Sequence, residues 1–431
     1  MRLSQNITKT LKEAPADELA VNAKLLIRAG YIHKEMAGAY SYLPLGLKVI
    51  ENIKQIVREE MNSLGSEELL MTSLQPKETW TLTGRWDDKV VDIWFKSQLK
   101  SGTDIGFGWS HEEPLMLLAK SLVKSYRDLP FSVYQFQTKF RNELRAKSGI
   151  MRGREFLMKD MYTFSRSQAE LDEFYQKATE AYLRVFERVG LGDITFLTFA
   201  SGGAFTQFSH EFQTITDSGE DTIYLDRARR LAVNDEVYND EIIKQLGLNK
   251  SNLEKVKAAE VGNIFNFKAV KGEQMDVFYS DENGERQPVY LSSYGIGVSR
   301  LMGVIAEHSN DEKGLIWNQN IAPAAVYLIA IGDERSVKSA DELYNILTGQ
   351  GVAVIYDDRD VRPGEKFADA DLMGIPWRVV VSEKTTANGH YEIKARTSNT
   401  LKQVTQLELL KIISGDIDEG LSSKKRASRK D

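Results

Sequence analysis

Two strand-like stretches joined by a charged loop constrain the fold of this 431-residue chain more than any other feature. Ser132 to Arg141 alternates as a half-buried strand does, and Arg154 to Ser165 reads as the strand that returns beside it. The connection from Asn142 to Gly153 is charged and contains two glycines. The pattern predicts an antiparallel β-hairpin with a long, basic loop.

The hairpin is basic although the chain as a whole is acidic. Between Lys139 and Lys159 there are seven bases and two acids, whereas the whole chain has 56 Lys and Arg against 62 Asp and Glu. Because side chains alternate along a strand, Arg141 and Glu143 should point to the same face. This pair suits a nucleotide, since arginine binds phosphate and a carboxylate accepts from the adenine amino group. The alternative is a solvated charged hairpin without a ligand.

A glycine-rich segment follows about 140 residues after the hairpin. Ser293 to Arg300 places Gly295 and Gly297 on a predicted strand, with Arg300 at the start of a helix. Glycine weakens a strand unless a ligand must approach the backbone closely. A tight packing turn between the strand and the helix is the alternative. Together with the hairpin, the segment indicates a nucleotide site.

The rest of the pattern predicts two domains, at 1–320 and 324–414. In the first, amphipathic helices at 44–64 and 167–189 accompany strands, including a short one at 69–71, which predicts an α+β fold with an antiparallel sheet. Residues 227–260 look polar and helical, like a small insertion. In the second, strands alternate with helices, which predicts a compact α/β domain with a parallel core. Its strands are expected at 326–331, 352–356 and 378–381, and its helices at 334–349 and 367–373.

Composition excludes several classes of function. The chain has no Cys, which excludes disulfide scaffolds, thiolate zinc sites and iron–sulfur clusters. No apolar run approaches the roughly 20 residues of a membrane span, and the N-terminus has no signal-peptide core, so we expect a cytoplasmic protein without membrane contact. Residues 415–431 form a basic tail that we expect to be disordered, and its bases either touch RNA phosphate or keep the chain soluble.

The segments described above resemble the three signature motifs of class II aminoacyl-tRNA synthetases. These are the helix and strand that end at Pro76, the hairpin from Arg141 to Phe156, and the glycine strand that ends in Arg300. Longer stretches are similar to the bacterial prolyl-tRNA synthetases over nearly the whole chain, to about residue 415. The stretches are Trp109–Glu113, Gln137–Arg141, Met151–Asp160, Ser209–Gln213, Ser218–Asp221, Arg362–Gly364 and Gly374–Pro376.

The resemblance implies two reactions at one site: ATP and L-proline give prolyl-adenylate and pyrophosphate, and the prolyl group then passes to the 3′ end of tRNA(Pro). Arg141 would hold the α-phosphate and the substrate carboxylate, and Arg152 and Arg300 would clamp the outer phosphates. Glu143 would read adenine while Phe156 stacks on it. The implied ATP site is Arg141, Glu143, Arg152, Phe156, Gln213, Gly297 and Arg300. Mg²⁺ would neutralise the remaining charge, with Glu211 and Gln213 as candidate ligands.

The implied proline site is Ser110, Glu112, Arg141 and His210. Ser110 stands where the family usually has Thr, so the hydroxyl is kept and a methyl is lost. Ser293 replaces a frequent Cys, which we expect to be neutral. We expect His111 to be a hydrogen-bonded loop histidine, and His210 is equally consistent with a pocket wall or a core position.

Only about 35 residues, 227–262, occupy the place of the domain-sized editing insertion that many bacterial relatives carry. They are too few for an independent domain. Because a missing methylene costs only about 1–3 kcal/mol, alanine should be mischarged without hydrolysis in cis, and a separate trans-editing deacylase is an implied partner. Residues 324–414 are implied to bind the anticodon, with Arg359, Arg362, Lys366 and Phe367 as candidate RNA contacts.

Two kinds of alternative function were weighed. A threonyl enzyme needs a zinc ligand from Cys, and a seryl enzyme carries a coiled-coil arm, for which no sustained heptad run exists. A synthetase-like binding subunit without catalysis would be expected to lack the arginines that hold ATP, yet Arg141, Arg152 and Arg300 are present. The helix from Pro44 to Leu64 is implied to be a dimer element, which predicts a homodimer, with a buried intramolecular helix as the alternative.

Overall fold

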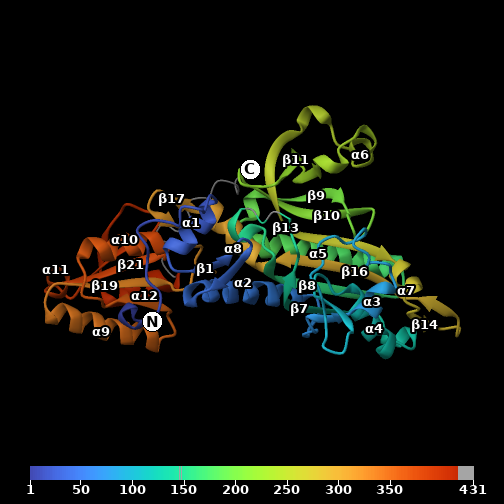
Figure 1. The fold of residues 1–431 in the computed structure, drawn as a ribbon. Helices are drawn as coiled ribbons and strands as arrows, with labels where there is room; N and C mark the ends of the chain where they lie inside the picture. The colour runs from blue at the N-terminus through green and yellow to red at the C-terminus, as the bar shows by residue number, and fades with distance from the viewer. Residues whose placement is uncertain (145, 147, 416–431) are drawn as a thin grey trace. The chain divides into compact units, whose positions relative to one another are not determined.

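The computed structural model describes residues 1–144, 146 and 148–415 (Figure 1). The chain divides into two compact units. The larger unit consists of Lys34–Tyr40 and Ile53–Glu307, and the smaller unit of Met1–His33, Ser41–Asn52 and the chain from His308 onward. This division differs from the predicted boundary at residue 320. The predicted tail lies outside the described residues, apart from Gly415.

The N-terminal segment belongs to the smaller unit because it pairs with a strand of that unit. The Met1 amino group donates to the Val354 carbonyl at 2.8 Å, and Arg2 forms a parallel bridge with Tyr356. The guanidinium of Arg2 lies 4.9 Å from the centre of the Tyr356 ring. These contacts join parts of the chain that are distant in sequence, which an inspection of local patterns does not detect.

A nine-stranded sheet forms the larger unit. Its strand order is β10–β9–β12–β11–β13–β16–β8–β7–β3, and neighbours are antiparallel except for β12 with β9 and β3 with β7. The strands are β3 (Glu67–Glu68), β7 (Phe131–Phe140), β8 (Glu155–Ser165), β9 (Thr195–Ser201), β10 (Phe208–Ile215), β11 (Asp221–Asp226), β12 (Leu231–Asn234), β13 (Glu254–Lys268) and β16 (Tyr290–Gly297). The predicted, largely antiparallel sheet is confirmed.

Helix α5 (Gln168–Arg188) packs along β8, β13 and β16 of this sheet (Figure 1). The Ser167 side chain caps its N-terminus by accepting from the backbone of Glu170, and the buried face includes Leu171 and Tyr182. The helix predicted at 167–189 is confirmed. The other helices and short strands are β4 (Leu74–Pro76), α3 (Lys77–Thr81), β5 (Lys96–Gln98), β6 (Asp104–Phe107), α4 (Glu112–Leu122), α6 (Asp240–Gln245), α7 (Val270–Gln274), β14 (Phe278–Ser280), β15 (Arg286–Pro288) and α8 (Val298–His308).

The two segments predicted to form the nucleotide site lie side by side in the nine-stranded sheet. The predicted hairpin is β7 and β8, which pair from Phe131 with Phe164 to Phe140 with Glu155. On the other side of β8 runs the glycine strand β16, in which Gly295 lies opposite Asp160. Helix α8 begins directly after β16, as predicted. The sheet therefore brings the hairpin and the glycine strand together.

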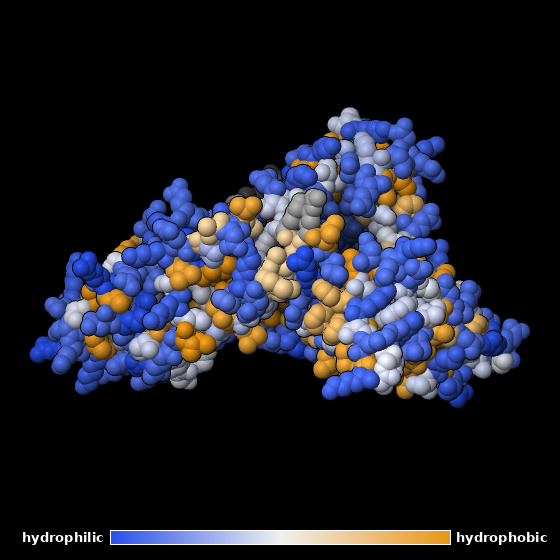
Figure 2. Space-filling model, viewed as in Figure 1, coloured by the Kyte–Doolittle hydropathy of each residue, from blue (hydrophilic) through white to orange (hydrophobic). Residues whose placement is uncertain are grey.

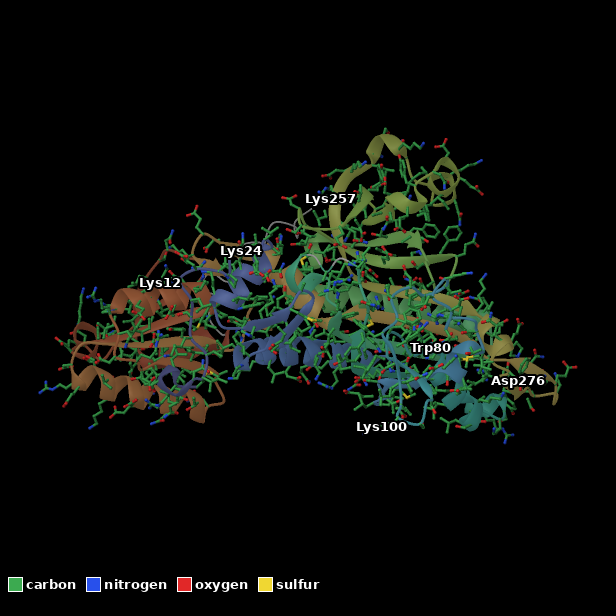
Figure 3. The ribbon with its side chains drawn as sticks, in the orientation of Figure 1. Lys12, Lys24, Trp80, Lys100, Lys257 and Asp276 are labelled. Atoms are coloured by element: carbon green, nitrogen blue, oxygen red, sulfur yellow. The ribbon has the colours of Figure 1, made fainter. Side chains whose placement is uncertain are left out.

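Two local predictions are wrong. Residues 227–260 contain helix α6, but β12 and the start of β13 are strands rather than polar helix. Exposed lysines, such as Lys257 (Figure 3), hide the strand character of β13 because they alternate with smaller buried or half-buried residues. The short strand expected at 69–71 is not found there; β3 ends at Glu68 and β4 begins at Leu74.

A five-stranded sheet forms the core of the smaller unit, in the order β20–β19–β21–β22–β23. The first three strands are parallel, which confirms the predicted parallel core, whereas β22 and β23 extend the sheet in antiparallel fashion and were not predicted. The elements are α1 (Val21–Arg28), β17 (Asn310–Asp311), β18 (Gly314–Leu315), β19 (Val326–Ile331), α9 (Glu334–Gly349), β20 (Val354–Asp357), α10 (Pro363–Met373), β21 (Trp377–Ser382), α11 (Glu383–Thr386), β22 (Tyr391–Ala395), β23 (Lys402–Val404) and α12 (Gln406–Ser414).

Helix α10 begins at Pro363, four residues earlier than the predicted start at Phe367. Proline suits the first position of a helix because its fixed φ is helical and its missing N–H would have no partner there. The helix ends at Gly374, where φ is +73° and an added Cβ would lie 2.3 Å from the Leu315 carbonyl oxygen. The predicted anticodon residues Lys366 and Phe367 are therefore the fourth and fifth residues of this helix.

Three further elements run through parts of both units. They are β1 (Ile32–Met36), β2 (Ala39–Tyr42) and α2 (Pro44–Ser63), the last of which confirms the predicted helix to within one residue. The face in Figure 2 is mostly hydrophilic with scattered hydrophobic side chains, as is usual for a globular surface. Within the described chain, none of the helices has the length and apolar character needed to cross a membrane.

Candidate active site

A polar cavity of about 150 Å³ lies beside the hairpin loop in the larger unit. Three arginines and four carboxylates line it, an unusual density of charge for one small space. The lining residues are Arg141, Glu143, Ser148, Met151, Arg152, Glu220, Asp221, Ala259, Glu260 and Arg300. Arg141, Glu143, Arg152 and Arg300, all predicted from the sequence, thus come together, although Arg300 is far from the others in the chain.

Arg141 lies just beyond the end of β7 and not within the strand. Its backbone N–H donates to the Arg154 carbonyl at 2.8 Å, and its own carbonyl accepts from the N–H of Glu143 at 2.7 Å. The shared orientation of Arg141 and Glu143 is therefore produced by a turn, and the explanation by strand alternation was wrong. Both side chains nevertheless face the same cavity.

The guanidinium of Arg141 has a hydrogen-bond donor without a partner in the described chain. It lies 5.3 Å from the centre of the Phe156 ring, and its Nε has no hydrogen-bond partner within the described chain. Burial lowers the pKa of Arg141, Glu260 opposes that shift, and Arg300 adds to it. An arginine remains charged despite such a shift. The cavity therefore holds a half-buried cation with a buried donor that has no partner within the described residues, which suits an anionic ligand.

Arg152 is clamped between two carboxylates. Its Nη2 donates to Glu143 Oε2 at 2.8 Å, and its other Nη forms an ion pair with Glu220. Although burial alone lowers it, the pKa of Arg152 is raised overall by hydrogen bonds to Glu220 and Glu143. The Glu143 carbonyl also accepts from Arg154 Nε at 3.0 Å. Glu143 and Arg152 are therefore held in place before any ligand binds.

Arg300 connects the start of α8 to two neighbouring segments. Its Nε donates to the Met151 carbonyl at 2.6 Å, and its Nη1 donates to the Glu260 carbonyl at 2.7 Å. The Glu260 carboxylate lies 3.3 Å from the same Nη1. Sequence reasoning missed Glu260, although its position opposite Gln213 on β10 places it at the site.

The glycines of β16 are required at least partly by packing. A Cβ at Gly295 would lie 2.7 Å from Asn263 Oδ1, and one at Gly297 would lie 3.1 Å from the Cβ of Arg300. Neither glycine has a positive φ. The close approach at Gly295 is that of Asn263 on the neighbouring strand β13, so packing between strands, and not the expected strand–helix turn, accounts for this glycine without a ligand.

A cluster of buried polar groups lies on β10 and β11. Gln213 Nε2 donates to Glu211 Oε2 at 2.8 Å and to Asp221 Oδ2 at 2.7 Å. Burial, and next the nearby Glu260, raise the pKa of Glu211 to about 8. Gln213 is fully buried, and its Oε1 has no partner within the described chain. The cluster therefore offers oxygen atoms that a cation could use.

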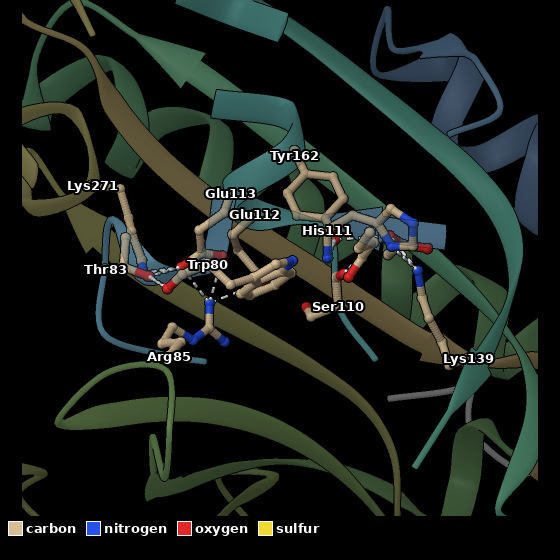
Figure 4. Close-up of polar contacts among 12 residues, drawn as sticks. Trp80, Thr83, Arg85, Ser110, His111, Glu112, Glu113, Lys139, Tyr162 and Lys271 are labelled. Atoms are coloured by element: carbon tan, nitrogen blue, oxygen red, sulfur yellow. Dashed lines mark hydrogen bonds and ion pairs between the residues drawn. The ribbon is translucent and has the colours of Figure 1, made fainter. Parts of the chain in front are cut away.

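The loop that contains Ser110 is held by buried hydrogen bonds (Figure 4). The Ser110 carbonyl accepts from Gln75 Nε2 at 2.8 Å. His111 is fully buried, with its Nδ1 2.7 Å from Lys139 Nζ and its Nε2 3.1 Å from the Thr72 carbonyl. Burial, followed by Lys139, lowers the pKa of His111 to about 3, so the ring is neutral. The expectation of a hydrogen-bonded loop histidine is confirmed.

The comparisons with known proteins agree along the whole chain. Residues 95–309 match the tRNA synthetase class II core domain (G, H, P, S and T), and residues 325–415 match the anticodon binding domain. The chain is 36% identical to the proline–tRNA ligase of Rickettsia africae over 428 residues, which covers 96% of this chain and 100% of the relative. The chain belongs to the proline–tRNA ligases. It is therefore an aminoacyl-tRNA synthetase that joins proline to tRNA.

Other relatives support the same family. The proline–tRNA ligase of Rickettsia akari is 37% identical, with coverage of 96% of this chain and 100% of the relative. A solved structure, the Giardia lamblia prolyl-tRNA synthetase in complex with prolyl-adenylate, is 17% identical with a TM-score of 0.75, covering 90% of this chain and 74% of that one. The fold is that of the class II proline–tRNA ligases, as the resemblance implied.

Seven residues predicted for ATP, metal or proline lie outside the polar cavity of this ligase. They are Ser110, Glu112, Phe156, His210, Gln213, Gly297 and the predicted metal ligand Glu211. His210 is half-buried, its Nδ1 shares a hydrogen bond with the Tyr175 hydroxyl at 2.7 Å, and its ring lies edge-on to Phe199. Burial lowers the pKa of His210. Its surroundings are aromatic, consistent with either of the two positions expected for it.

The predicted anticodon residues of the ligase occupy different environments. Arg359 donates to Asp357 at 2.7 Å and to Asp369 at 2.7 Å, and Lys366 is buried with its ammonium 3.2 Å from two backbone carbonyls. These two cations form contacts inside the unit, which the sequence did not predict, and their role as RNA contacts stays a prediction. Arg362 is exposed, and Phe367 is half-buried with Arg378 over its ring at 4.7 Å.

Proposed function

We propose that the polar cavity binds the phosphates of ATP, and that Arg141, Arg152 and Arg300 are the catalytic residues. The observation that carries this proposal is the convergence of the three arginines, one of which has a buried donor without a partner. The first reaction is the attack of the proline carboxylate on the α-phosphorus. Because both reactants are anions, the protein's task is to neutralise charge and to hold the two groups in line.

The geometry supports a distinct role for each arginine. Arg141 is half-buried and its buried Nε has no partner within the described residues, so it is suited to the α-phosphate and the substrate carboxylate. Arg152 is half-exposed and exchanges part of its carboxylate pairing for the outer phosphates when ATP enters. Arg300 donates hydrogen bonds to two backbone carbonyls, which hold its guanidinium in a preorganised position for the same phosphates. Glu143 reads the adenine amino group, Phe156 stacks on the ring, and Gly297 and Gln213 complete the site.

Mg²⁺ fits the polar cluster on β10. Magnesium prefers oxygen ligands, commonly one or two protein groups together with substrate phosphates. Glu211 and Gln213 supply such oxygens, and the unpartnered Oε1 of Gln213 lacks only a cation or donor. Within the described residues no group of three or more His or acidic side chains forms a complete metal site, so phosphate oxygens would complete the ligand set. When bound, the ion would neutralise phosphate charge, and Glu211 would release its proton.

The proline site proposed for this ligase is Ser110, Glu112, Arg141 and His210. Glu112 carries a carboxylate that suits the secondary ammonium of proline, and the Ser110 hydroxyl offers a further acceptor. Both residues are buried: Ser110 lies on a loop that is fixed by its neighbours, and Glu112 is the first residue of α4. In the smaller unit, the proposed contacts for anticodon bases remain Arg362, Phe367, Arg359 and Lys366, of which the last two also form internal contacts.

The wider proposals concern assembly and editing. Residues 1–320 carry catalysis and 324–414 carry anticodon recognition in a cytoplasmic homodimer, with 227–262 in place of an editing insertion. That segment contains the short helix α6, strand β12 and part of strand β13, and both strands belong to the nine-stranded sheet. We therefore expect alanyl-tRNA(Pro) to persist when the purified protein is added, and to be hydrolysed only by a separate deacylase. Rapid loss of alanine would contradict this proposal.

The test of the site uses proline-dependent ATP–pyrophosphate exchange. Arg141→Lys should lower kcat/KM by about 100-fold, because a lysine ammonium cannot reproduce the planar donors of arginine at a buried anion site. The matched control is Arg166→Lys, since Arg166 follows the same hairpin but pairs with Glu170 and does not line the cavity. It should change exchange less than twofold. Equal activities of the two variants would contradict the assignment.

A further inference from the structure

A buried arginine that no motif singled out stands beside the proposed proline loop. Arg85 is only 4% exposed, and three aromatic rings surround its guanidinium. The centres of the Trp80, Trp109 and Phe205 rings lie 5.1, 4.5 and 4.8 Å from it. The flat guanidinium is thus confined between aromatic faces, and Figure 4 shows its polar end directed at the start of α4.

Arg85 bridges two adjacent carboxylates. Its Nη1 lies 2.9 Å from Glu113 Oε2 and 3.3 Å from Glu112 Oε2. A second cation, Lys271, donates to Glu113 Oε1 at 2.6 Å, and the Thr83 hydroxyl donates to the same oxygen at 2.7 Å (Figure 4). Two carboxylates and two cations therefore form a neutral, buried cluster.

The two carboxylates have different tasks in this cluster. Glu113 is fully buried, and both of its oxygens accept hydrogen bonds from protein groups. Glu112 is 2% exposed, and within the described residues Arg85 is its only ion-pair partner, through one oxygen. Glu113 thus anchors Arg85, and the other oxygen of Glu112 is left for a ligand.

We propose that Arg85 is a positioning residue for amino-acid binding, which aims the Glu112 carboxylate at the substrate ammonium. This inference rests on the proposed role of Glu112 in the proline site. Arg85 touches no reacting atom. It acts through Glu112, whose carboxylate pairs with the guanidinium and whose chain neighbour His111 is held by a backbone hydrogen bond to the Tyr162 hydroxyl.

A lysine at position 85 would not hold the Glu112 carboxylate in the same orientation. The guanidinium is planar, so it fits between the rings of Trp80 and Trp109 while its Nη1 reaches both carboxylates. A lysine ammonium is a compact, strongly hydrated charge on a flexible stem, and it has no planar face to stack. Arg85→Lys therefore keeps the charge of the cluster but releases Glu112 from its fixed orientation.

Steady-state ATP–pyrophosphate exchange on the full-length protein tests this role, with KM measured separately for proline and for ATP. Arg85→Lys should raise the KM for proline by about 10- to 100-fold, the range expected for a lost hydrogen bond to a charged group, and leave the KM for ATP within twofold. The matched control is Lys271→Met, which removes an equally buried cation of the cluster that bonds Glu113 and not Glu112. It should lower the melting temperature but leave the KM for proline within twofold.

Glu112→Gln separates this inference from the function on which it rests. If Glu112→Gln raises the KM for proline but Arg85→Lys does not, the positioning role is overturned and the proline site stands. If Glu112→Gln has no effect, both are overturned. Three results would show that Arg85 is purely structural. The first is that Arg85→Lys raises the KM for proline and the KM for ATP equally, and the second is that Arg85→Lys and Lys271→Met change the KM for proline equally. The third is that neither Arg85→Lys nor Arg85→Gln folds.

Discussion

The buried carboxyl of Glu211 should make the stability of the larger unit fall as pH rises. Burial, and after it the charge of Glu260, raise its pKa to about 8, whereas the ordinary value is 4.5. The folded state therefore keeps a proton that the unfolded state loses above pH 4.5. The stabilisation is complete below that value and is lost progressively up to about pH 8. This gap corresponds to about 5 kcal/mol.

The variant Glu211→Gln isolates this effect. Its amide oxygen can still accept from Gln213 and Asn234, as Glu211 Oε2 does, but the group no longer ionises. Urea unfolding is followed between pH 5 and pH 8.5 by fluorescence of the tryptophans of the larger unit, Trp80, Trp86, Trp94 and Trp109. The free energy of unfolding of the wild type should fall relative to that of the variant by about 4 kcal/mol across this range, because part of the total is already lost at pH 5.

An exposed neighbour provides the control for the Glu211 experiment. Asp217→Asn removes a carboxylate that lies close in sequence and faces solvent, so its pH profile should follow the wild type. The reasoning would be refuted if the wild type and Glu211→Gln gave parallel profiles. A cation at the site should have the opposite pH dependence, since magnesium must displace the proton and should bind more tightly as pH rises to 8.

Three further outcomes are expected. Arg359→Ala should destabilise the smaller unit by about 3 kcal/mol in urea unfolding, because it leaves the buried Asp357 without its cation. Arg362→Ala should instead weaken tRNA binding in a filter assay and leave the free energy of unfolding unchanged, since Arg362 is exposed. A tRNA affinity equal to that of the wild type would contradict the role of Arg362 in RNA binding. Gly295→Ala should lower the free energy of unfolding by about 1–3 kcal/mol and raise the KM for ATP, because the added Cβ would displace Asn263. An unchanged melting temperature would contradict this prediction.

The fold was predictable where one local pattern dominated. The β7–β8 hairpin, the glycine strand β16 and helix α5 show their periods in the sequence, and the structure reproduces them. Strand β13 was missed because exposed lysines at its start resemble a polar helix. The pairing of Arg2 with Tyr356 was also missed, since a contact across the whole chain leaves no periodic signal.

Only the site residues that belong to recognisable motifs could be predicted from the sequence. Arg141 and Arg300 were identified from their motifs and do share one cavity. The sequence predicts Arg359 as a candidate RNA contact but does not show that Asp357 and Asp369 converge on it. No sequence motif identified Arg85 as a candidate site residue, because its proposed role depends on aromatic rings and carboxylates that come together only in the folded structure.

The central claim is that the arginine-lined cavity activates proline with ATP. The most direct measurement is ATP–pyrophosphate exchange by the full-length protein with each of the twenty amino acids in turn. The account predicts strong exchange with proline, and weaker exchange with alanine because a missing methylene discriminates by only about 1–3 kcal/mol. Exchange with threonine or serine in place of proline, or no exchange with any amino acid, would contradict it.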